Sequence, residues 1–189
     1  MSRIYQLFGG AITITLPSNL LDVAELRQVA DTQEVYVEDN STVSFLVDIT
    51  QSVPVPLKEY RAAIEYHYTN LAEENAAAES GIRSVDVQQC QVRQECHGPI
   101  LLVGQQAVAK FRKGNDQAEL VDVFMALWRI PTRNAEITLT VCLFASWGLT
   151  ACQCSYACDR SMYRIPMNSR RDRWRNMKTS SRLLLNLCG

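Results

Sequence analysis

The sequence predicts an α+β fold in which a mainly antiparallel β-sheet is covered by helices. Several strand-like segments follow one another with short turns between them, so hairpins outnumber helices. A single long segment, Leu57 to Leu71, repeats apolar residues at spacings of three and four, which is typical of a helix with one buried face. The chain has 189 residues, of which 47% are hydrophobic, enough for one domain with a substantial core.

The first predicted strand lies near the N-terminus. From Ile12 to Leu16 isoleucine or leucine alternates with threonine, the period of a half-buried strand, and Pro17 ends the run. Asp22 then precedes Glu25 by three residues, as in a capping box. These signals predict a short helix that ends near Val29.

Two leucines flank this predicted cap. Leu21 and Leu26 occupy the positions at which apolar side chains meet as a hydrophobic staple around a helix start. We expect them to pack against each other.

A hairpin is expected next. Asp31-Thr-Gln-Glu34 is predicted to be a loop that leads into a strand at Val35–Val37, and Asp39–Ser41 is predicted to be a turn into a strand at Val43–Ile49. Two prolines, Pro54 and Pro56, then introduce the long helix. Four further strands are predicted at 82–92, 100–111, 120–130 and 137–144.

Charge divides the chain unevenly. Residues 1–158 carry 18 acidic and 11 basic side chains, whereas residues 159–189 carry 2 acidic and 8 basic ones. The segment after about residue 145 shows neither a helical stripe nor a strand alternation. We therefore expect a domain over residues 1–145 and a Cys- and Arg-rich, poorly ordered tail over residues 146–189.

The tail contains the strongest candidates for metal or nucleic-acid binding. Cys152, Cys154 and Cys158 offer three thiols, but they lack the paired C-x-x-C spacing of a zinc knuckle and no histidine lies nearby. The run Arg170–Arg175 includes Trp174, and such a run can bind phosphates and stack on bases. Incidental cysteines and a solvated extension are the favoured interpretations of these two features.

Three other features suggest chemistry and are better explained by structure. Gly9-Gly10 precedes a strand and lacks a following Gly-Lys-Ser, so a tight backbone approach or a turn is expected in place of a phosphate loop. His67 lies in the predicted helix without a serine or cysteine nucleophile motif, and we expect a packed or half-exposed side chain and not a base. The adjacent pair Cys96-His97 is expected to lie in a loop. We therefore expect no catalytic residues, no metal and no cofactor.

The acidic segment between Asp22 and Asp39 points to a partner surface. It contains six carboxylates and one base, Arg27. Asp31 and Glu34 are three residues apart beside Gln33, and this short segment can orient a basic partner.

The same segment resembles one family. Leu7-Phe-Gly-Gly-Ala-Ile12, the strand end at Pro17, Asp22-Val-x-x-Leu-Arg27 and Asp31-Thr-Gln-Glu-Val-Tyr-Val37 are similar to the Ran guanine nucleotide release factors, the MOG-type nuclear import proteins. Similarity extends over about residues 5–141. The resemblance implies a six-stranded antiparallel sheet with helices on its faces, a sandwich similar to the photosystem protein PsbP. It gives no match for the family's C-terminal covering helix after about Val141.

The resemblance also implies a function and a site. We expect binding to the small GTPase Ran, promotion of guanine nucleotide release and a role in nuclear protein import, in the nucleus and cytoplasm. The resemblance places the Ran-binding residues at Asp31 and Glu34, with Gln33 and Asp22 beside them. We expect a monomeric regulatory protein without enzymatic chemistry, and neither a membrane nor a nucleic acid as partner. The alternatives are a metal- or nucleic-acid-binding protein that acts through its tail, and a PsbP-like structural subunit.

Overall fold

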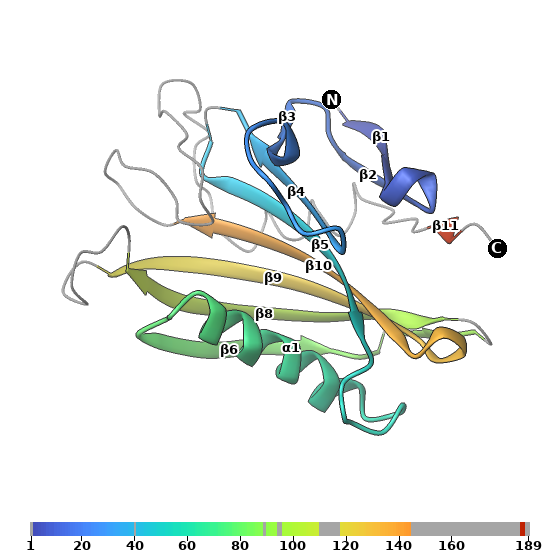
Figure 1. Cartoon of the computed structure of the whole chain (residues 1–189). Coiled ribbons are helices and arrows are strands. Elements are labelled where there is room, and N and C mark those ends of the chain that lie inside the picture. Colours follow the sequence, from blue (N-terminus) through green and yellow to red (C-terminus); the bar gives the residue numbers. More distant parts are fainter. Residues whose placement is uncertain are drawn as a thin grey trace.

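The computed structural model describes residues 2–39, 41–88, 90–93, 96–109, 118–144 and 186–187. Two sheets and one α-helix make up this part of the chain (Figure 1). An eight-stranded sheet has the strand order β3-β4-β5-β10-β9-β8-β6, with β7 paired to β8 beside this path. A smaller sheet has the order β1-β2-β11.

The bounds of the strands follow in chain order. They are β1 Ser2–Leu7, β2 Ile12–Pro17, β3 Leu20–Asp22, β4 Gln33–Glu38, β5 Val43–Gln51, β6 Glu79–Asp86, β7 Gln91–Val92, β8 His97–Ala109, β9 Ala118–Ile130, β10 Ala135–Phe144 and β11 Asn186–Leu187. The helix α1 spans Tyr60–Glu74, and 3₁₀ turns lie at η1 Phe8–Gly10, η2 Val23–Glu25 and η4 Pro131–Arg133.

The large sheet is covered on both faces. One core cluster joins the β1–β2 hairpin to one face of β4, β5, β9 and β10, with Ile14, Phe45 and Trp128 among its buried members. A second cluster packs α1 on the opposite face of β8 and β9 through Ile64 and Tyr68. Figure 1 shows the hairpin and α1 on opposite sides of the long strands.

The seating of α1 depends on a glycine in β8. A Cβ atom at Gly104 would lie 2.5 Å from the Cζ and Oη atoms of Tyr68, so only glycine lets this ring rest on the sheet. The Tyr68 hydroxyl lies 2.9 Å from the carbonyl oxygen of Gln105 and 3.0 Å from that of Gly81, on neighbouring strands. The ring therefore ties the helix to both β6 and β8.

Most predicted elements are confirmed. The strand at Ile12–Pro17, the β4–β5 hairpin, the helix and the strands at β8, β9 and β10 lie within a few residues of their expected places. The main sheet has eight strands where the resemblance implied six. The short strand β3 lies at one end of the strand order, and the two-residue strand β7 pairs with β8 beside it. The predicted strand at 82–92 is split into β6 and β7.

The predicted helix after Asp22 is wrong. The chain forms only the 3₁₀ turn η2 there, in which the amide of Ala24 donates to the Asp22 carboxylate at 2.8 Å. Leu21 and Leu26 are 47% and 63% exposed, so they do not form the expected staple. The cap is real, but no apolar face follows it that packing could stabilise as a longer helix.

Two further predictions differ from the structure. Gln33 and Glu34 belong to strand β4 and not to a loop, and His97 begins β8. The covering helix and the domain boundary at residue 145 concern residues outside those described, so the boundary stays a prediction.

Candidate functional site

Strained backbone marks the tip of the β1–β2 hairpin. Phe8, Gly9 and Gly10 all have positive φ, at 50°, 67° and 93°. Glycine adopts this region freely, but Phe8 does so at a cost of about 1–3 kcal/mol that its surroundings must offset. The Gly9-Gly10 pair is therefore a turn, as expected from the sequence.

Glu34 holds this turn from strand β4. Its Oε1 accepts a hydrogen bond of 2.7 Å from the backbone amide of Phe8, and its Oε2 accepts one of 3.1 Å from the Tyr36 hydroxyl. The side chain is half-buried between the two sheets. Both carboxylate oxygens are thus engaged within the protein.

Asp22 lies on the same face of the sheet as Glu34. It is paired in register with Tyr36, across from β3 to β4. Burial, the charge of Glu34 and then the charge of Asp22 raise the pKa of Tyr36 well above its ordinary value. The structure therefore brings two of the predicted carboxylates together around one phenol.

Gln33 faces the other way. Successive residues of a strand alternate between faces, and the Gln33 amide donates to Asp48 on β5 at 3.5 Å, on the α1 side of the sheet. Burial raises the pKa of Asp48 against the opposing effects of Gln33, His67 and Thr32. The predicted site is thus divided between two faces.

Asp31 is the exposed member of the predicted set. It lies just before β4 in a turn closed by a 2.8 Å bond from the Gln33 amide to the Ala30 carbonyl. Within the described part of the chain, no hydrogen bond or ion pair engages its carboxylate. Asp31 is therefore available to a partner without breaking internal contacts.

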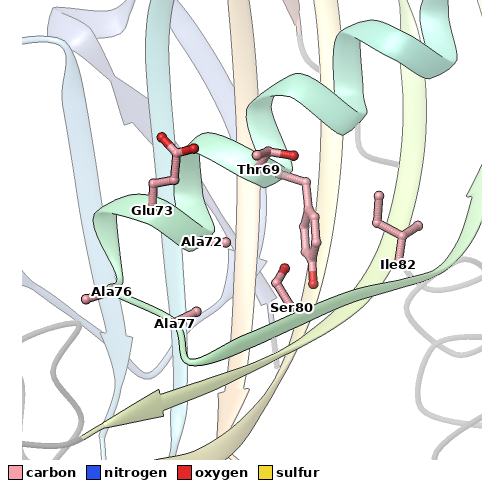
Figure 2. A pocket seen from close by; sticks show the side chains of 8 residues that line it. Thr69, Ala72, Glu73, Ala76, Ala77, Ser80 and Ile82 are labelled. Atoms are coloured by element: carbon pink, nitrogen blue, oxygen red, sulfur yellow. The ribbon is translucent and has the colours of Figure 1, made fainter. Parts of the chain in front are cut away.

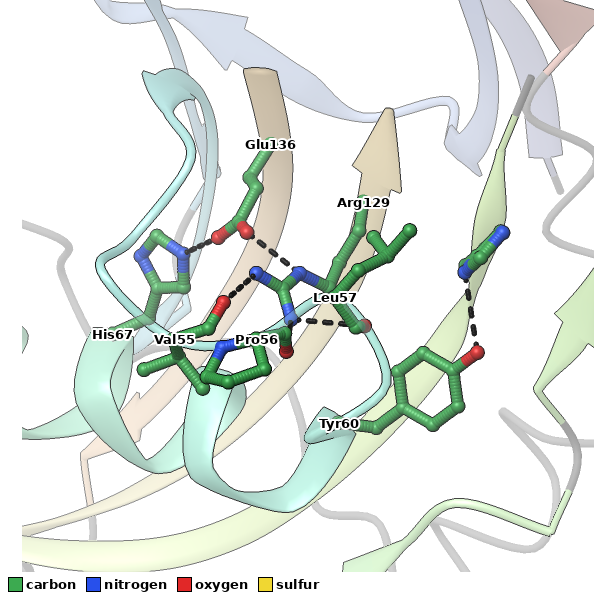
Figure 3. A network of polar contacts seen from close by, with 8 residues as sticks. Val55, Pro56, Leu57, Tyr60, His67, Arg129 and Glu136 are labelled. Atoms are coloured by element: carbon green, nitrogen blue, oxygen red, sulfur yellow. Dashed lines mark hydrogen bonds and ion pairs between the residues drawn. The ribbon is translucent and has the colours of Figure 1, made fainter. Parts of the chain in front are cut away.

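A buried ion network between α1 and the sheet is a further feature, which the sequence analysis did not predict (Figure 3). Arg129 donates from Nε to Glu136 at 2.7 Å, and the other carboxylate oxygen of Glu136 lies 2.5 Å from Nε2 of His67. The remaining guanidinium nitrogens bind the carbonyl groups of Val55, Pro56 and Leu57 at 2.7–3.0 Å.

This network has a structural explanation. It satisfies the backbone of the irregular segment before α1 and ties that segment to β9 and β10. His67 is buried, as the sequence suggested. A signal was present in the sequence: Arg129 is an isolated charge inside the strand predicted at 120–130, and Glu136 directly precedes the strand predicted at 137–144. Such charges are paired when buried.

The other candidates from the sequence gain no chemistry from the structure. His97 is buried and its Nδ1 lies 3.1 Å from the Tyr60 hydroxyl. Burial raises the pKa of the Cys96 thiol, which disfavours the reactive thiolate. Among the described residues, no three His, Cys, Asp or Glu side chains form a metal-binding group. Cys152, Cys154, Cys158 and the Arg170–Arg175 run lie outside the described residues.

In the described part of the chain, no helix is long and apolar enough to cross a bilayer.

Comparison with known proteins assigns the chain to a family. A family model described as "Ran-interacting Mog1 protein" matches residues 5–143. The chain belongs to the Mog1 family. The match takes in the strained hairpin tip, all four predicted site residues and both faces of the large sheet.

Relatives within the Mog1 family agree with this assignment. The chain is 36% identical to a Ran guanine nucleotide release factor of Danio rerio over 152 residues, which are 74% of this chain and 76% of the relative. It is 32% identical to the human Ran guanine nucleotide release factor, over 74% of each chain. The crystal structure of the Ran-binding protein Mog1p of Saccharomyces cerevisiae superposes with a TM-score of 0.61 at 25% identity, over 77% of this chain and 78% of that one.

Proposed function

We propose that this Mog1-family protein binds the small GTPase Ran and promotes the release of its guanine nucleotide, in support of nuclear protein import. The family match over residues 5–143 carries the proposal, because it includes the predicted site residues Asp22, Asp31, Gln33 and Glu34. Relatives named Ran guanine nucleotide release factor and nuclear import protein support it.

The proposed contact surface is the β3–β4 edge with the hairpin tip beside it. Asp31, exposed and unengaged among the described residues, is assigned to direct contact with basic side chains of Ran. Asp22 adds negative charge on β3 opposite Tyr36, and Glu34 holds Phe8 in its strained conformation. Gln33 supports the edge from the opposite face through Asp48.

Nucleotide release requires no catalytic group in this protein. A factor that binds Ran more tightly when the nucleotide is absent lowers the affinity of Ran for nucleotide by the same free energy, since the two binding events are linked. Carboxylates suit this role because they compete with phosphate for the same cations. We propose a monomer that acts in the nucleus and cytoplasm as a regulatory protein.

The test is the loss of fluorescent GDP from Ran, together with Ran affinity. Asp31→Lys should weaken Ran binding by about tenfold or more, because it reverses a charge at the interface. Glu59→Lys makes the same change of charge just before α1, on the far side of the sheet, and should leave binding unchanged.

Two outcomes would count against the proposal. Wild-type protein that neither binds Ran nor accelerates GDP loss would refute the function. Normal binding by Asp31→Lys would refute the assigned surface while leaving the function in place.

A further inference from the structure

Strand β6 forms an open end of the large sheet. In the strand order it has a neighbour on one side only, β8, and six of its eight residues are exposed. One row of its backbone N–H and C=O groups therefore has no strand partner within the described residues. Such an edge is a template for pairing with another extended chain.

A groove runs beside this edge (Figure 2). It has a volume of about 440 Å³ and lies between the C-terminal half of α1 and β6. Most of its lining is small or apolar; the lining residues are Tyr68, Thr69, Ala72, Glu73, Ala76, Ala77, Ser80 and Ile82. Ser80 and Ile82 come from β6, two residues apart and so on one face, and Ile82 is 40% exposed.

The surface around this edge is acidic. Glu73 lines the groove, Glu74 follows it at the end of α1, and Glu79 lies on β6 with its side chain on the opposite face from Ser80. All three are exposed, and no cation among the described residues pairs with them. Arg83, the cation of β6 itself, is bound to Asp122 at 3.1 Å. The charge around the groove therefore favours a basic partner.

We propose that β6 binds an extended basic segment of a partner protein, which adds to the sheet as a further strand. Its backbone pairs with Glu79–Ile82, since the register of β6 against β8 shifts between Ile82 and Ser84 and ends the regular edge there. Apolar side chains of the segment enter the groove beside Ser80 and Ile82. The alternate Lys or Arg side chains then lie on the opposite face of the sheet, where they reach Glu79.

A second copy of this chain is a poorer occupant. Two β6 strands paired antiparallel about their centres would set Glu79 opposite Asp86 at both ends. Like charges directly opposite each other destabilise a pair of strands. Pairing would also have to cross the register shift.

The position of β6 makes this surface independent of the proposed Ran contact. In the strand order, β3 and β4 lie at one end and β6 at the other. A partner at β6 and Ran at the β3–β4 edge can therefore bind at the same time.

The test uses the full chain and a fluorescein-labelled hexapeptide that alternates lysine and valine, followed by fluorescence anisotropy. Saturable binding is expected for the wild type. Ile82→Lys and Glu79→Lys should each weaken it by about tenfold, since one blocks the groove and the other removes a counter-charge. Glu59→Lys, with the same change of charge at the N-terminal end of α1, should bind as the wild type does.

A second peptide with proline in place of valine separates strand pairing from simple charge attraction, because proline lacks the backbone N–H. It should not bind. Equal binding of both peptides, or equal binding by Glu79→Lys, would overturn the proposal. So would a concentration-dependent dimer in sedimentation that Ile82→Lys abolishes, with no binding of the peptide. Glu79 is exposed, so its variant stays informative even if Ile82→Lys fails to fold.

Discussion

Glu34 illustrates how one carboxylate can serve the fold and a binding surface at once. Its hydrogen bond to the Phe8 amide offsets a backbone conformation that a non-glycine residue rarely adopts. The residue type of Glu34 and its spacing from Asp31 predicted a charge that faces a partner. Its side chain points toward the hairpin tip because the β1–β2 hairpin packs beside β4, and no local pattern in the sequence predicts that contact.

Substitutions at Glu34 separate its two roles. Glu34→Gln keeps an oxygen that accepts from the Phe8 amide and removes the charge, whereas Glu34→Asp keeps the charge on a shorter side chain. If Glu34 acts through the hairpin tip, Glu34→Gln should bind Ran within about twofold of the wild type, and Glu34→Asp should lose about tenfold. Calorimetric titration with Ran checks this. The reverse order would show that the charge of Glu34 contacts Ran directly.

Asp48 should make the folded protein less stable as pH rises. Its pKa in the folded state is raised from 3.8 by burial, so the folded state holds a proton that the unfolded chain has already lost. Stability therefore falls as pH rises from about 3.8 through the raised value. Asp48→Asn keeps an acceptor for Gln33 and removes the charge.

The measurement is thermal unfolding followed by circular dichroism at pH 7 and at acidic pH. Asp48→Asn should melt at or above the wild-type temperature at pH 7, and this advantage should shrink in acid. Asp39→Asn, at an exposed turn, serves as the control and should keep the wild-type pH profile. A variant that melts lower than the wild type at pH 7 would mean that the charged form stabilises the fold.

Local signals fixed the positions of elements better than their types. The alternation at Ile12–Pro17 and the apolar stripe that became α1 were sufficient, because each face is buried as its period requires. The cap at Asp22 was also located correctly. Its 3₁₀ turn was mistaken for a helix because capping marks where a turn starts and says nothing of what packs beyond it.

The segment between β5 and α1 is stabilised by Arg129 and not by regular structure. Arg129→Met would remove a donor from the carbonyl groups of Val55, Pro56 and Leu57, of which Pro56 keeps a bond from the Glu59 amide. It would also leave Glu136 buried with His67 as its remaining partner. Breaking a buried pair in this way costs roughly 3–5 kcal/mol, whereas replacing both charged partners costs less. Arg129→Met combined with Glu136→Leu should therefore recover part of the loss.

Urea unfolding of both single variants and the double variant measures this coupling. Strictly additive losses would show that Arg129 and Glu136 act separately, against the geometry of the network.

Across the whole molecule, the fold class followed from the sequence, but the strand order did not. The predicted hairpins connect neighbours along the chain, and β4–β5 and β8–β9 are such pairs. The insertion of β10 between β5 and β9 joins segments separated by the whole of α1, β6 and β8. No local pattern records that pairing. It also sets which edges stay open, and thus where both proposed surfaces lie.

The central place of β10 has a consequence for synthesis of the protein. It is the last long strand of the described chain, and it pairs with β5 on one side and β9 on the other. Until residues 135–144 leave the ribosome, β5 and β9 are both exposed edges of separate half-sheets. Such edges are sites of aggregation. We therefore expect a nascent chain that stalls before residue 135 to expose both edges and to need chaperones, since the complete sheet requires residues 135–144.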